Sequence, residues 1–568
     1  MSTDTPQKLN KVEKIKDASN FLRGELPTEL HDEKDHFGSD SLQLLKFFGT
    51  YQQDDRDLRV TRRKEGLDKA FSCMVRCRIP GGRLTSEQLL THLDLCEELA
   101  NSTLKITTRQ TFQFHGIPKS DLRTLVQRIN AISLSTLAAC GDVNRNVMCC
   151  PAKRVGPVYD EMHRLTDEIT EGLAPKTRAY QELFLIDPDS GEKELVASSK
   201  PDIEPLYGAR YLPRKFKVGI ALPEDNCIDI YTQDLGFLAI VRDGVVIGYN
   251  VLVGGGMGNT PALKRTYPAL GKRMAFCTPD QALEVAQAVL KVQRDYGNRE
   301  DRKVARMKYL VDKWGVEKFR RAVEEYFGGP LKDCTPDDVT DVDHHMGWQA
   351  QGDGKWSYGL NIENGRLHDS GDTRLKETLR SICAKFQPEI RLTAKQSIIF
   401  CDFEESQKAE LEQMIRDHQT TTSEDTSTVR SWSMACVGLP TCGLAVTESE
   451  RMLPSIIDQL EQPLKDLGLE NERFSIHMTG CPNGCARPYN SDIGLVGKSK
   501  DSYTLYLGGT ALGTRLSYIF RDKVPAADVP KVLTSIFKAF KENREGDESL
   551  GTFCTRVGGE QLQQLTAQ

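Results

Sequence analysis

Alternating apolar and polar residues mark two strands, with a helix between them, over residues 71–117. The run FSCMVRCRIPGG, from Phe71, and the run LKITTRQTFQFHG, from Leu104, have the pattern of half-buried strands. Between them, TSEQLLTHLDLCEELA places apolar residues at helical spacing after Thr85, whose side chain can cap the helix. The pattern therefore predicts a small α+β unit.

The same arrangement recurs later in the chain, as WSYGLNIENGRL, TRLKETLRSICAKF and IRLTAKQSIIF. Both copies contain a basic residue, an apolar residue and a threonine, with a glutamine three positions further on. The matching segments are Lys105-Ile106-Thr107 with Gln110, and Arg391-Leu392-Thr393 with Gln396. Two aligned segments in the same order indicate an internal duplication. We expect two related α+β halves around a pseudo-two-fold axis.

The rest of the chain divides around these copies into an N-terminal segment and two larger units. Each copy is followed by mixed strands and helices, over 143–344 and 421–568, and TTTSEDTSTVRS has the composition of a linker into the last unit. The charged residues 1–70 are interpreted as an arm that contacts a partner, with a solvated tail as the alternative. The two halves, 71–142 plus 345–420, would form the central domain of a mixed α/β protein.

The composition of the 568 residues is typical of a globular protein, with 39% hydrophobic and 27% charged residues. No apolar run approaches the ~20 residues of a membrane span, and the first residues lack the apolar core of a secretion signal. We therefore expect a cytoplasmic protein whose 16 cysteines are reduced. The net charge of −6 argues against a broadly basic nucleic-acid surface, so local basic clusters are candidate anion sites.

Four cysteines near the C-terminus have the pattern of a metal-cluster site. Cys436 and Cys442 stand in ACVGLPTCGLA, and Cys481 and Cys485 in TGCPNGCARP, with 38 residues between the pairs. Glycine and proline in both loops allow tight turns and leave N–H groups free to face sulfur atoms. Four thiolates from two short loops suit an iron–sulfur cluster. The C-x5-C and C-x3-C spacings differ from the C-x2-C pairs of structural zinc sites, which leaves zinc or unrelated buried cysteines as alternatives.

Basic residues gather where turns and strand ends are predicted in the first half of the chain. In LPRKFK, alternation places Lys215 and Lys217 on the same face of an extended strand, where two ammonium groups repel one another unless an anion lies between them. We therefore expect a strongly anionic ligand near a redox centre. The other members of this group are Arg76, Arg78, Lys105, Arg109, Arg145 and Arg214.

Three other patterns lack an essential part of their motif. GLVGKSK has Asp492 in place of the first glycine of a phosphate-binding P-loop, and VGGGMGN has Asn259 where a dinucleotide loop has its third glycine. No nicotinamide or flavin site is expected, so reducing equivalents should come from a partner. The pair His344 and His345 has no HExxH context and is interpreted as ordinary surface or core histidines.

The segments TGCPNGCARP, ACVGLPTCGLA, RQTFQFHG, VNRNV and LPRKFK together resemble the sirohaem-dependent sulfite and nitrite reductases. YQQDDRD and MVRCRIPGG are similar to one branch of that family, the assimilatory NADPH-dependent sulfite reductases and their haemoprotein beta component. The resemblance extends from about residue 45 to the C-terminus. It implies an internally duplicated three-domain fold in which 143–344 binds sirohaem and substrate, and 421–568 binds a 4Fe–4S cluster and sirohaem.

The resemblance also assigns roles to individual residues. Cys436, Cys442, Cys481 and Cys485 would hold the cluster, and Cys485 would also bind the sirohaem iron as a bridging ligand. Catalytic residues that face the substrate match Arg76, Arg145, Lys215 and Lys217. Residues near the sirohaem edge match Lys105, Arg109, Gln113, His115, Arg214, Arg306 and Asn483. Position 105 is lysine where relatives have arginine, which keeps the charge and loses the two-pronged contact.

The implied reaction is the six-electron reduction of sulfite to sulfide in assimilatory sulfur metabolism, which supplies cysteine biosynthesis. Nitrite reduction to ammonia on the same cofactors is the alternative. Two further alternatives are a non-catalytic sirohaem or iron–sulfur carrier and a cluster protein without haem. Four clustered cations argue against a carrier, because a carrier needs no oxyanion site. The implied electron donor is an NADPH-oxidising flavoprotein that forms a hetero-oligomer with this chain, with ferredoxin as the alternative.

Overall fold

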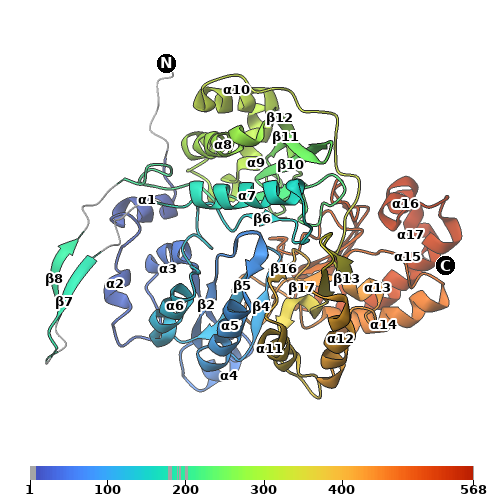
Figure 1. Cartoon of the computed structure of the whole chain (residues 1–568), viewed down its shortest axis with the longest axis horizontal. Coiled ribbons are helices and arrows are strands. Elements are labelled where there is room, and N and C mark those ends of the chain that lie inside the picture. Colours follow the sequence, from blue (N-terminus) through green and yellow to red (C-terminus); the bar gives the residue numbers. More distant parts are fainter. Residues whose placement is uncertain (1–7, 177–181, 189, 191–192, 199–202, 567–568) are drawn as a thin grey trace.

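The computed structural model describes residues 8–176, 182–188, 190, 193–198 and 203–566. In Figure 1, two similar α/β layers lie side by side at the bottom, coloured blue and gold. The green strands β10–β12, with the helices α8–α10, lie above them, and the orange and red C-terminal helices lie to the right. None of the described helices is long and apolar enough to cross a membrane.

The first of the two layers is a five-stranded antiparallel sheet with two helices. Its order is β1 (Thr50–Asp54), β2 (Phe71–Arg76), β5 (Phe112–Ile117), β4 (Leu104–Ile106) and β15 (Arg366–Leu367). The helices are α5 (Ser86–Glu98) and α6 (Leu122–Ala131). Thr85 caps α5 in a capping box with Gln88, as the sequence predicts.

The second layer repeats the first, element by element. Its order is β13 (Gly347–Ala350), β14 (Trp356–Leu360), β17 (Ile398–Phe403), β16 (Ile390–Leu392) and β3 (Arg83–Leu84). Its helices are α11 (Leu375–Phe386) and α12 (Lys408–Asp417). The predicted internal duplication is therefore confirmed, and it gives the mixed α/β fold that the sequence indicates.

Each layer takes its last strand from the other half of the duplication. Arg366 of β15 pairs with Lys105 of β4, and Arg391 of β16 pairs with Arg83 of β3. The two matching glutamines cross the same boundary. Gln110 Nε2 donates to Leu392 O (3.0 Å), and Gln396 Nε2 donates to Ile106 O (3.4 Å). These reciprocal contacts place a pseudo-two-fold axis between the halves.

Two further sheets also share one topology, which the sequence analysis did not predict. One has the order β6 (Met148–Cys149), β9 (Val218–Ala221), β10 (Leu235–Arg242), β11 (Val245–Val253) and β12 (Lys272–Cys277). The other is β18 (Met434–Ala435), β19 (Ile476–Thr479), β20 (Ile493–Ser499), β21 (Ser502–Leu507) and β22 (Tyr518–Pro525). In both, the first three strands are parallel and the last two antiparallel. The duplication therefore extends beyond the central halves.

Helices cover these two sheets. Those of the first sheet are α7 (Pro157–Gly172), α8 (Ala282–Tyr296), α9 (Met307–Trp314) and α10 (Val316–Phe327). Those of the second are α13 (Thr428–Ser431), α14 (Leu453–Asp466), α15 (Val529–Asn543), α16 (Leu550–Val557) and α17 (Gly559–Leu565). The hairpin of β7 (Glu182–Ile186) and β8 (Lys193–Ser198) projects from the body at the left of Figure 1.

The described part of the predicted N-terminal arm packs against the body. Its helices are α1 (Lys11–Ala18), α2 (Leu26–Glu29), α3 (Ser41–Leu44) and α4 (Arg59–Lys64), and β1 joins the first sheet. Glu13 and Lys16 of α1 are buried; Glu13 pairs with Arg299, and Lys16 Nζ donates to Leu212 O (3.0 Å). Contact of this segment with a partner stays a prediction.

The boundary between the halves generates a stability prediction at Gly365. This residue has φ +71°, and a Cβ added there would lie 2.4 Å from Ile106 O and 2.9 Å from Gln396 Cβ. Gly66 has the same φ and no atom within 4 Å of an added Cβ. Gly66→Ala should therefore cost only the left-handed backbone strain, about 1 kcal/mol, whereas Gly365→Ala should cost about 3 kcal/mol or more.

The measurement is urea-induced unfolding of both variants, followed by far-ultraviolet circular dichroism. Equal losses of stability in the two variants would show that the close approach at Gly365 has no energetic weight.

Candidate functional site

The two cysteine loops interlock at the ends of β18 and β19. Gly480 N donates to Cys436 Sγ (3.3 Å), and Val446 N donates back to Gly480 O (2.8 Å). The loop of Cys442 therefore closes over the residue that precedes Cys481. Two stretches separated by 38 residues become one structural unit, as the motif predicts.

Glycines make this close approach possible. Gly438 has φ +66°, and a Cβ there would lie 2.7 Å from Ser449 N. Gly484 has φ +62°, and a Cβ there would lie 2.8 Å from the Tyr489 ring. Only glycine fits such positions without strain. Gly438 and Gly484 are thus required by the backbone, whereas Gly443 has no atom within 4 Å of an added Cβ.

The four thiols lie close enough to affect one another's protonation. Burial raises the pKa of Cys481 to about 12, with a further contribution from the charge of Cys485. Burial and the charge of Cys485 also raise the pKa of Cys436 and of Cys442. Four thiolates so placed repel one another unless a cationic metal core lies among them. This donor set fits an iron–sulfur cluster.

Cys485 lies at the boundary between the cysteine loops and the first half of the duplication. It is the exposed member of the four. Its carbonyl accepts from Thr108 Oγ1 (3.0 Å), and the carbonyl of Thr108 accepts from Arg487 Nη1 (3.2 Å). Arg109 follows Thr108 in the same loop after β4, and its side chain donates to Gln233 and to the carbonyl of Asn146.

Lys215 and Lys217 flank Phe216 just before β9. Phe216 is fully buried, while both lysines are partly exposed, so the predicted alternation is confirmed. Burial, then the charges of Arg214 and Arg306, lower the pKa of Lys215 to about 7. Burial, then the charges of Arg109 and Lys215, lower the pKa of Lys217 well below its usual value.

No carboxylate forms an ion pair with either lysine in the described part of the chain. The charge of Cys485 raises the pKa of Lys215, against the lowering by burial and by the arginines. Lys215 therefore lies near the cysteine loops. A cation held largely away from water without a partner raises the free energy of the folded protein. An anion bound between two such cations removes this penalty. The pair therefore fits a strongly anionic ligand beside Cys485.

Three other predicted cations, Arg76, Arg145 and Arg109, make contacts that fix their side chains. Arg76 Nη2 donates to Gln113 Oε1 (2.6 Å), and Arg145 is buried with Nε donating to Gly141 O (2.9 Å). Arg109 Nη1 donates to Gln233 Oε1 (2.8 Å). The charges of Arg145 and Arg76 both contribute to the lowered pKa of Arg109, about 9, after burial, so these three guanidinium groups lie in one basic cluster.

The remaining predicted edge residues are more fully partnered. Arg306 forms a two-pronged pair with the buried Asp234 (2.9 and 2.8 Å), and Arg214 lies 3.9 Å from Asp142. Their charges are thus partly neutralised by the protein. Asn483 Nδ2 lies 3.5 Å from Cys481 Sγ, so Asn483 faces the cysteine loop.

His115 and Gln113 form a buried polar pair next to Arg76. Gln113 Nε2 and His115 Nε2 are 2.8 Å apart. Burial and the charges of Arg366 and Lys105 lower the pKa of His115 well below its usual value. His115 is therefore neutral at pH 7 and orients Gln113, which in turn holds Arg76.

Lys105 has a protein partner that its position in a basic motif does not reveal. Its Nζ lies 2.5 Å from Glu450 Oε2 and also donates to Asn364 O. Arg366 shares the same carboxylate (2.5 Å), and both Lys105 and Glu450 are almost fully buried. Lys105 thus ties β4 to the second half of the duplication and to the cysteine loop.

Two basic residues near the site were missed by the sequence analysis. Arg487 is buried, and it pairs with Asp229 as well as Thr108. Lys308 donates to Gly256 O (3.0 Å) and Gly258 O (2.8 Å), in the glycine run dismissed as a dinucleotide loop. That run packs on the cysteine loop, since Asn259 N donates to Pro482 O (3.0 Å). The feature of the sequence that could have identified Arg487 was its position in the segment GCARP.

The fold and this arrangement fit a redox protein in which an iron–sulfur cluster lies beside a basic cluster suited to an anion. The profile described as "Nitrite and sulphite reductase 4Fe-4S domain" matches residues 140–331 and 427–568. The profile described as "Nitrite/Sulfite reductase ferredoxin-like half domain" matches residues 66–132 and 349–418. Both profiles match twice, in agreement with the duplicated fold.

Individual proteins match over nearly the whole chain. The sulfite reductase (NADPH) hemoprotein beta-component of Staphylococcus haemolyticus is 43% identical over 98% of this chain and 96% of its own. The sulfite reductase (ferredoxin) of Synechococcus elongatus is 42% identical over 99% of this chain and 92% of its own. The solved structure of the Mycobacterium tuberculosis NirA protein covers 98% of both chains, with a TM-score of 0.80 and 25% identity.

The chain belongs to the nitrite and sulfite reductase family. The predicted family, fold class and cofactors, a 4Fe–4S cluster linked to sirohaem, are thereby confirmed. The roles given to individual residues stay predictions, which the geometry above supports to different degrees.

The buried pair of Lys105 and Glu450 generates a prediction that separates its structural from its ligand-binding role. Lys105→Met should destabilise the protein by about 3 kcal/mol, because Glu450 loses half of its compensating charge. Glu450→Gln should also destabilise it, and the double variant should lose less than the sum of the two.

The measurement is urea unfolding of the four proteins in this cycle. Lys385→Met is the control, because it breaks an exposed pair with Glu410 and should cost less than about 1 kcal/mol. Strict additivity of Lys105→Met and Glu450→Gln would rule out the pair as a stabilising contact.

Proposed function

We propose that this chain catalyses the six-electron reduction of sulfite to sulfide in assimilatory sulfur metabolism, as a source of sulfide for cysteine biosynthesis. The observation behind this proposal is the unpaired lysine pair, Lys215 and Lys217, beside Cys485. Relatives that are 42–43% identical over nearly the full length and are named sulfite reductases support the choice of substrate.

In this proposal Cys436, Cys442, Cys481 and Cys485 hold the cluster, and Cys485 also binds the sirohaem iron. When bound, the two cofactors supply the electrons and the metal centre at which sulfur is reduced. The residues around Cys485 provide the rest of the site. Thr108 and Arg487 fix the backbone of the cysteine loop through the Cys485 carbonyl and the Thr108 carbonyl.

In this proposal the basic residues have two different roles, according to their contacts. Arg76 and Arg145 are held by Gln113 and by backbone carbonyls, so they present fixed donors to the oxyanion. Among the described residues, no carboxylate forms an ion pair with Lys215 or Lys217, so their ammonium groups can follow the substrate as its oxygens leave as water. With a pKa near 7, Lys215 can both give and regain a proton at physiological pH.

The carboxylates of sirohaem would be met by Arg109, Arg214 and Arg306, together with Lys105, Gln113, His115 and Asn483. Arg109 and Arg214 are the strongest members of this set, because their own partners leave charge uncompensated. Lys105 is the weakest candidate for binding a sirohaem carboxylate, because its ammonium group already pairs with Glu450.

Nitrite is the second candidate substrate, because the matching family includes reductases of both anions. Both are small oxyanions, and the basic cluster has no feature that selects between them. The names of the relatives favour sulfite.

Electrons would enter at the cysteine loop of Cys442. Leu444 and Val446 are 68% and 40% exposed there, an apolar patch next to a proposed cluster ligand. Arg56 of the N-terminal segment donates to Ala445 O, which places the predicted partner-contacting segment beside this patch. The donor would be an NADPH-oxidising flavoprotein, with ferredoxin as the alternative, because relatives of both kinds match equally well.

The test is the visible spectrum and the turnover of protein produced with sirohaem available. Sulfite should be converted fully to sulfide with reduced methyl viologen, and faster at substrate saturation than nitrite is converted to ammonia. Lys217→Met should keep the haem bands and slow turnover at least tenfold. Turnover of nitrite alone would overturn sulfite as the substrate, and comparison of NADPH plus flavoprotein with reduced ferredoxin would identify the donor.

A pH profile tests the role of Lys215. The protonated ammonium is the active form, so kcat/KM for sulfite should fall as the pH rises through the pKa of Lys215. That pKa is about 7, and carboxylates of a bound cofactor raise it, so the midpoint should lie at or above 7.

Lys215→Arg is the matched control, because guanidinium stays protonated throughout this range while sulfite titrates identically in both proteins. An unchanged profile in Lys215→Arg would assign the titration to sulfite or to another residue.

A further inference from the structure

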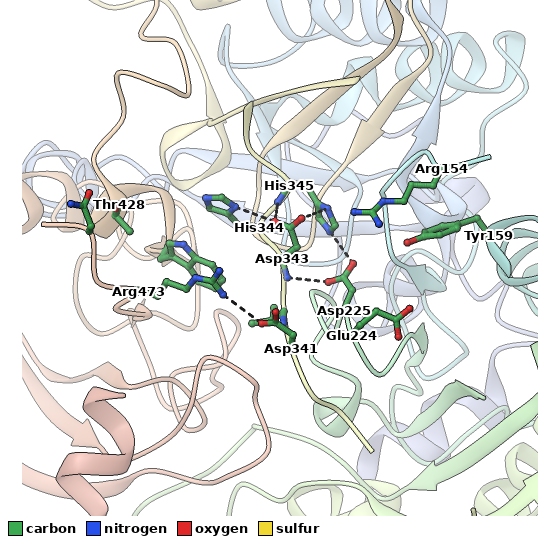
Figure 2. A pocket seen from close by; sticks show the side chains of 13 residues that line it. Arg154, Tyr159, Glu224, Asp225, Asp341, Asp343, His344, His345, Thr428 and Arg473 are labelled. Atoms are coloured by element: carbon green, nitrogen blue, oxygen red, sulfur yellow. Dashed lines mark hydrogen bonds and ion pairs between the residues drawn. The ribbon is translucent and has the colours of Figure 1, made fainter. Parts of the chain in front are cut away.

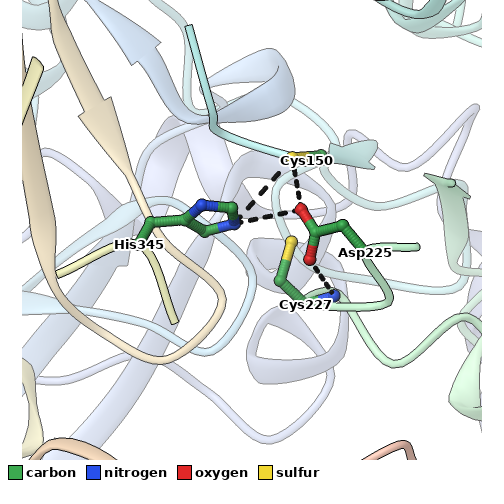
Figure 3. A group of neighbouring side chains, drawn as sticks. All are labelled: Cys150, Asp225, Cys227 and His345. Carbon is green, nitrogen blue, oxygen red and sulfur yellow. Dashed lines mark hydrogen bonds and ion pairs between the residues drawn. The ribbon is translucent and has the colours of Figure 1, made fainter. Parts of the chain in front are cut away.

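A second group of metal-binding side chains lies apart from the proposed cluster ligands. Cys150, Asp225, Cys227 and His345 are all buried, and their ligand atoms lie within 4.8 Å of one another. Figure 3 shows the four side chains converging from three separate stretches of chain. The sequence analysis interpreted these cysteines as buried apolar residues and His345 as an ordinary histidine.

The internal duplication relates this group to the cluster loops. Cys150 directly follows β6, just as Cys436 directly follows β18. Cys227 and Cys485 each lie eight residues before the next strand, which begins at Leu235 in one copy and at Ile493 in the other. The registers of the two sheets agree, since Leu235 pairs with Val218 and Ile493 pairs with Ile476. Cys150 and Cys227 thus occupy the positions of two cluster ligands.

The other two cluster ligands have no counterpart in this copy. Pro223 stands four residues before Cys227, where Cys481 stands before Cys485, and Gly156 stands six residues after Cys150, where Cys442 follows Cys436. Neither residue can bind a metal. A four-thiolate cluster is therefore excluded at this position, and Asp225 and His345 supply the remaining donors.

The four ligand atoms lie close enough together for one ion to bind them all, once the Cys150 thiol has lost the proton that it donates to Asp225. Cys150 Sγ lies 2.7 Å from Asp225 Oδ2 and 3.9 Å from His345 Nε2, and His345 Nε2 lies 3.1 Å from Asp225 Oδ2. Two sulfurs, one imidazole nitrogen and one carboxylate oxygen form a set that tetrahedral zinc accepts.

The surrounding contacts orient these donors. Asp225 Oδ1 accepts from Cys227 N (3.1 Å) and Asp343 N (3.2 Å), which leaves Oδ2 turned toward the group. On the far side of the imidazole, His345 Nδ1 lies 3.5 Å from Asp343 Oδ2. A carboxylate behind a histidine ligand is a common second layer of zinc sites, because it fixes the ring and raises its basicity.

Access for an ion comes from the neighbouring cavity. A cavity of about 470 Å³ is lined by Asp225 and His345, and by further acidic residues that include Glu224, Asp341 and Asp343. Figure 2 shows these carboxylates around the opening, with Arg154 and Arg473 at its sides. None of the residues predicted to bind cluster, sirohaem or sulfite lines it. The acidic lining would raise the local concentration of a cation.

We propose that Cys150, Asp225, Cys227 and His345 bind one zinc ion. Binding displaces to solvent every proton that the two thiols and the imidazole carry, so two thiolates, one carboxylate and a neutral imidazole surround the ion. The ion would join the end of β6, the β9–β10 connection and the segment before β13. It would thus fasten the 143–344 unit to the second ferredoxin-like half, independently of the substrate.

The experiment measures zinc and iron by plasma mass spectrometry in the full-length holoenzyme, purified without chelators. Wild type should contain about one zinc ion per chain. Cys227→Ala and His345→Ala should each lose most of it while keeping the haem absorbance. Cys277→Ala, a change of an equally buried cysteine in β12, should retain it. Zinc-edge X-ray absorption should show two sulfurs at ~2.3 Å and nitrogen or oxygen at ~2.0–2.1 Å.

Several outcomes would overturn the proposal. These are wild type without zinc even after incubation with Zn²⁺, equal zinc loss in Cys277→Ala, or zinc retained in both ligand variants. A Cys150–Cys227 disulfide in an unreduced digest would also exclude the site. The zinc content of wild type decides the question even where a variant fails to fold, and it does not depend on which anion the enzyme reduces.

Discussion

The exchange of short strands between the two ferredoxin-like halves is the constraint on which the rest of the structure depends. β3 leaves the first half to complete the second sheet, and β15 returns to complete the first. Gln110 and Gln396 then anchor the loop that follows β4 and the equivalent loop after β16. Because the loop after β4 carries Thr108 and Arg109, the exchange also sets the distance between the basic cluster and Cys485. Neither half could keep this geometry alone, since each lacks an edge strand.

Charge is distributed around this frame in two distinct ways. Arg306 with Asp234 and Lys105 with Glu450 are buried ion pairs, in which each cation is neutralised by a carboxylate of the protein. Lys215 and Lys217 form no ion pair with a carboxylate in the described part of the chain, and burial, with the charges of neighbouring cations, lowers their pKa values. The uncompensated lysines store unfavourable free energy that an anionic ligand relieves. The proposed anion site thus lies where the two lysines have no ion-pair partner among the described residues, near a cysteine that is itself exposed.

The duplication places different side chains at equivalent positions of the two matching sheets. In the C-terminal copy, glycines at 438 and 484 let two loops close around four thiols. In the other copy, Pro223 and Gly156 replace two of those thiols, and Asp225 and His345 approach instead. A large inorganic cluster needs four cysteines held apart by folded loops, whereas a single ion needs donors in near contact. In the zinc proposal, replacement of two of the four thiols changes the kind of metal site that these positions form.

The sequence by itself determined the features that depend on neighbours along the chain. The cysteine and glycine spacing identified the cluster loops, the repeated Lys/Arg-x-Thr-x-x-Gln pattern revealed the central duplication, and alternation placed Lys215 and Lys217 on one face. Only the tertiary structure decided which charges are neutralised and which strands are exchanged. Glu450 meets Lys105, and His345 meets Cys150, across long stretches of sequence. Such contacts form when surfaces far apart in the sequence pack together. They cannot be predicted from local periodicity, because hydrophobic patterning determines which face is buried but not which partner covers it.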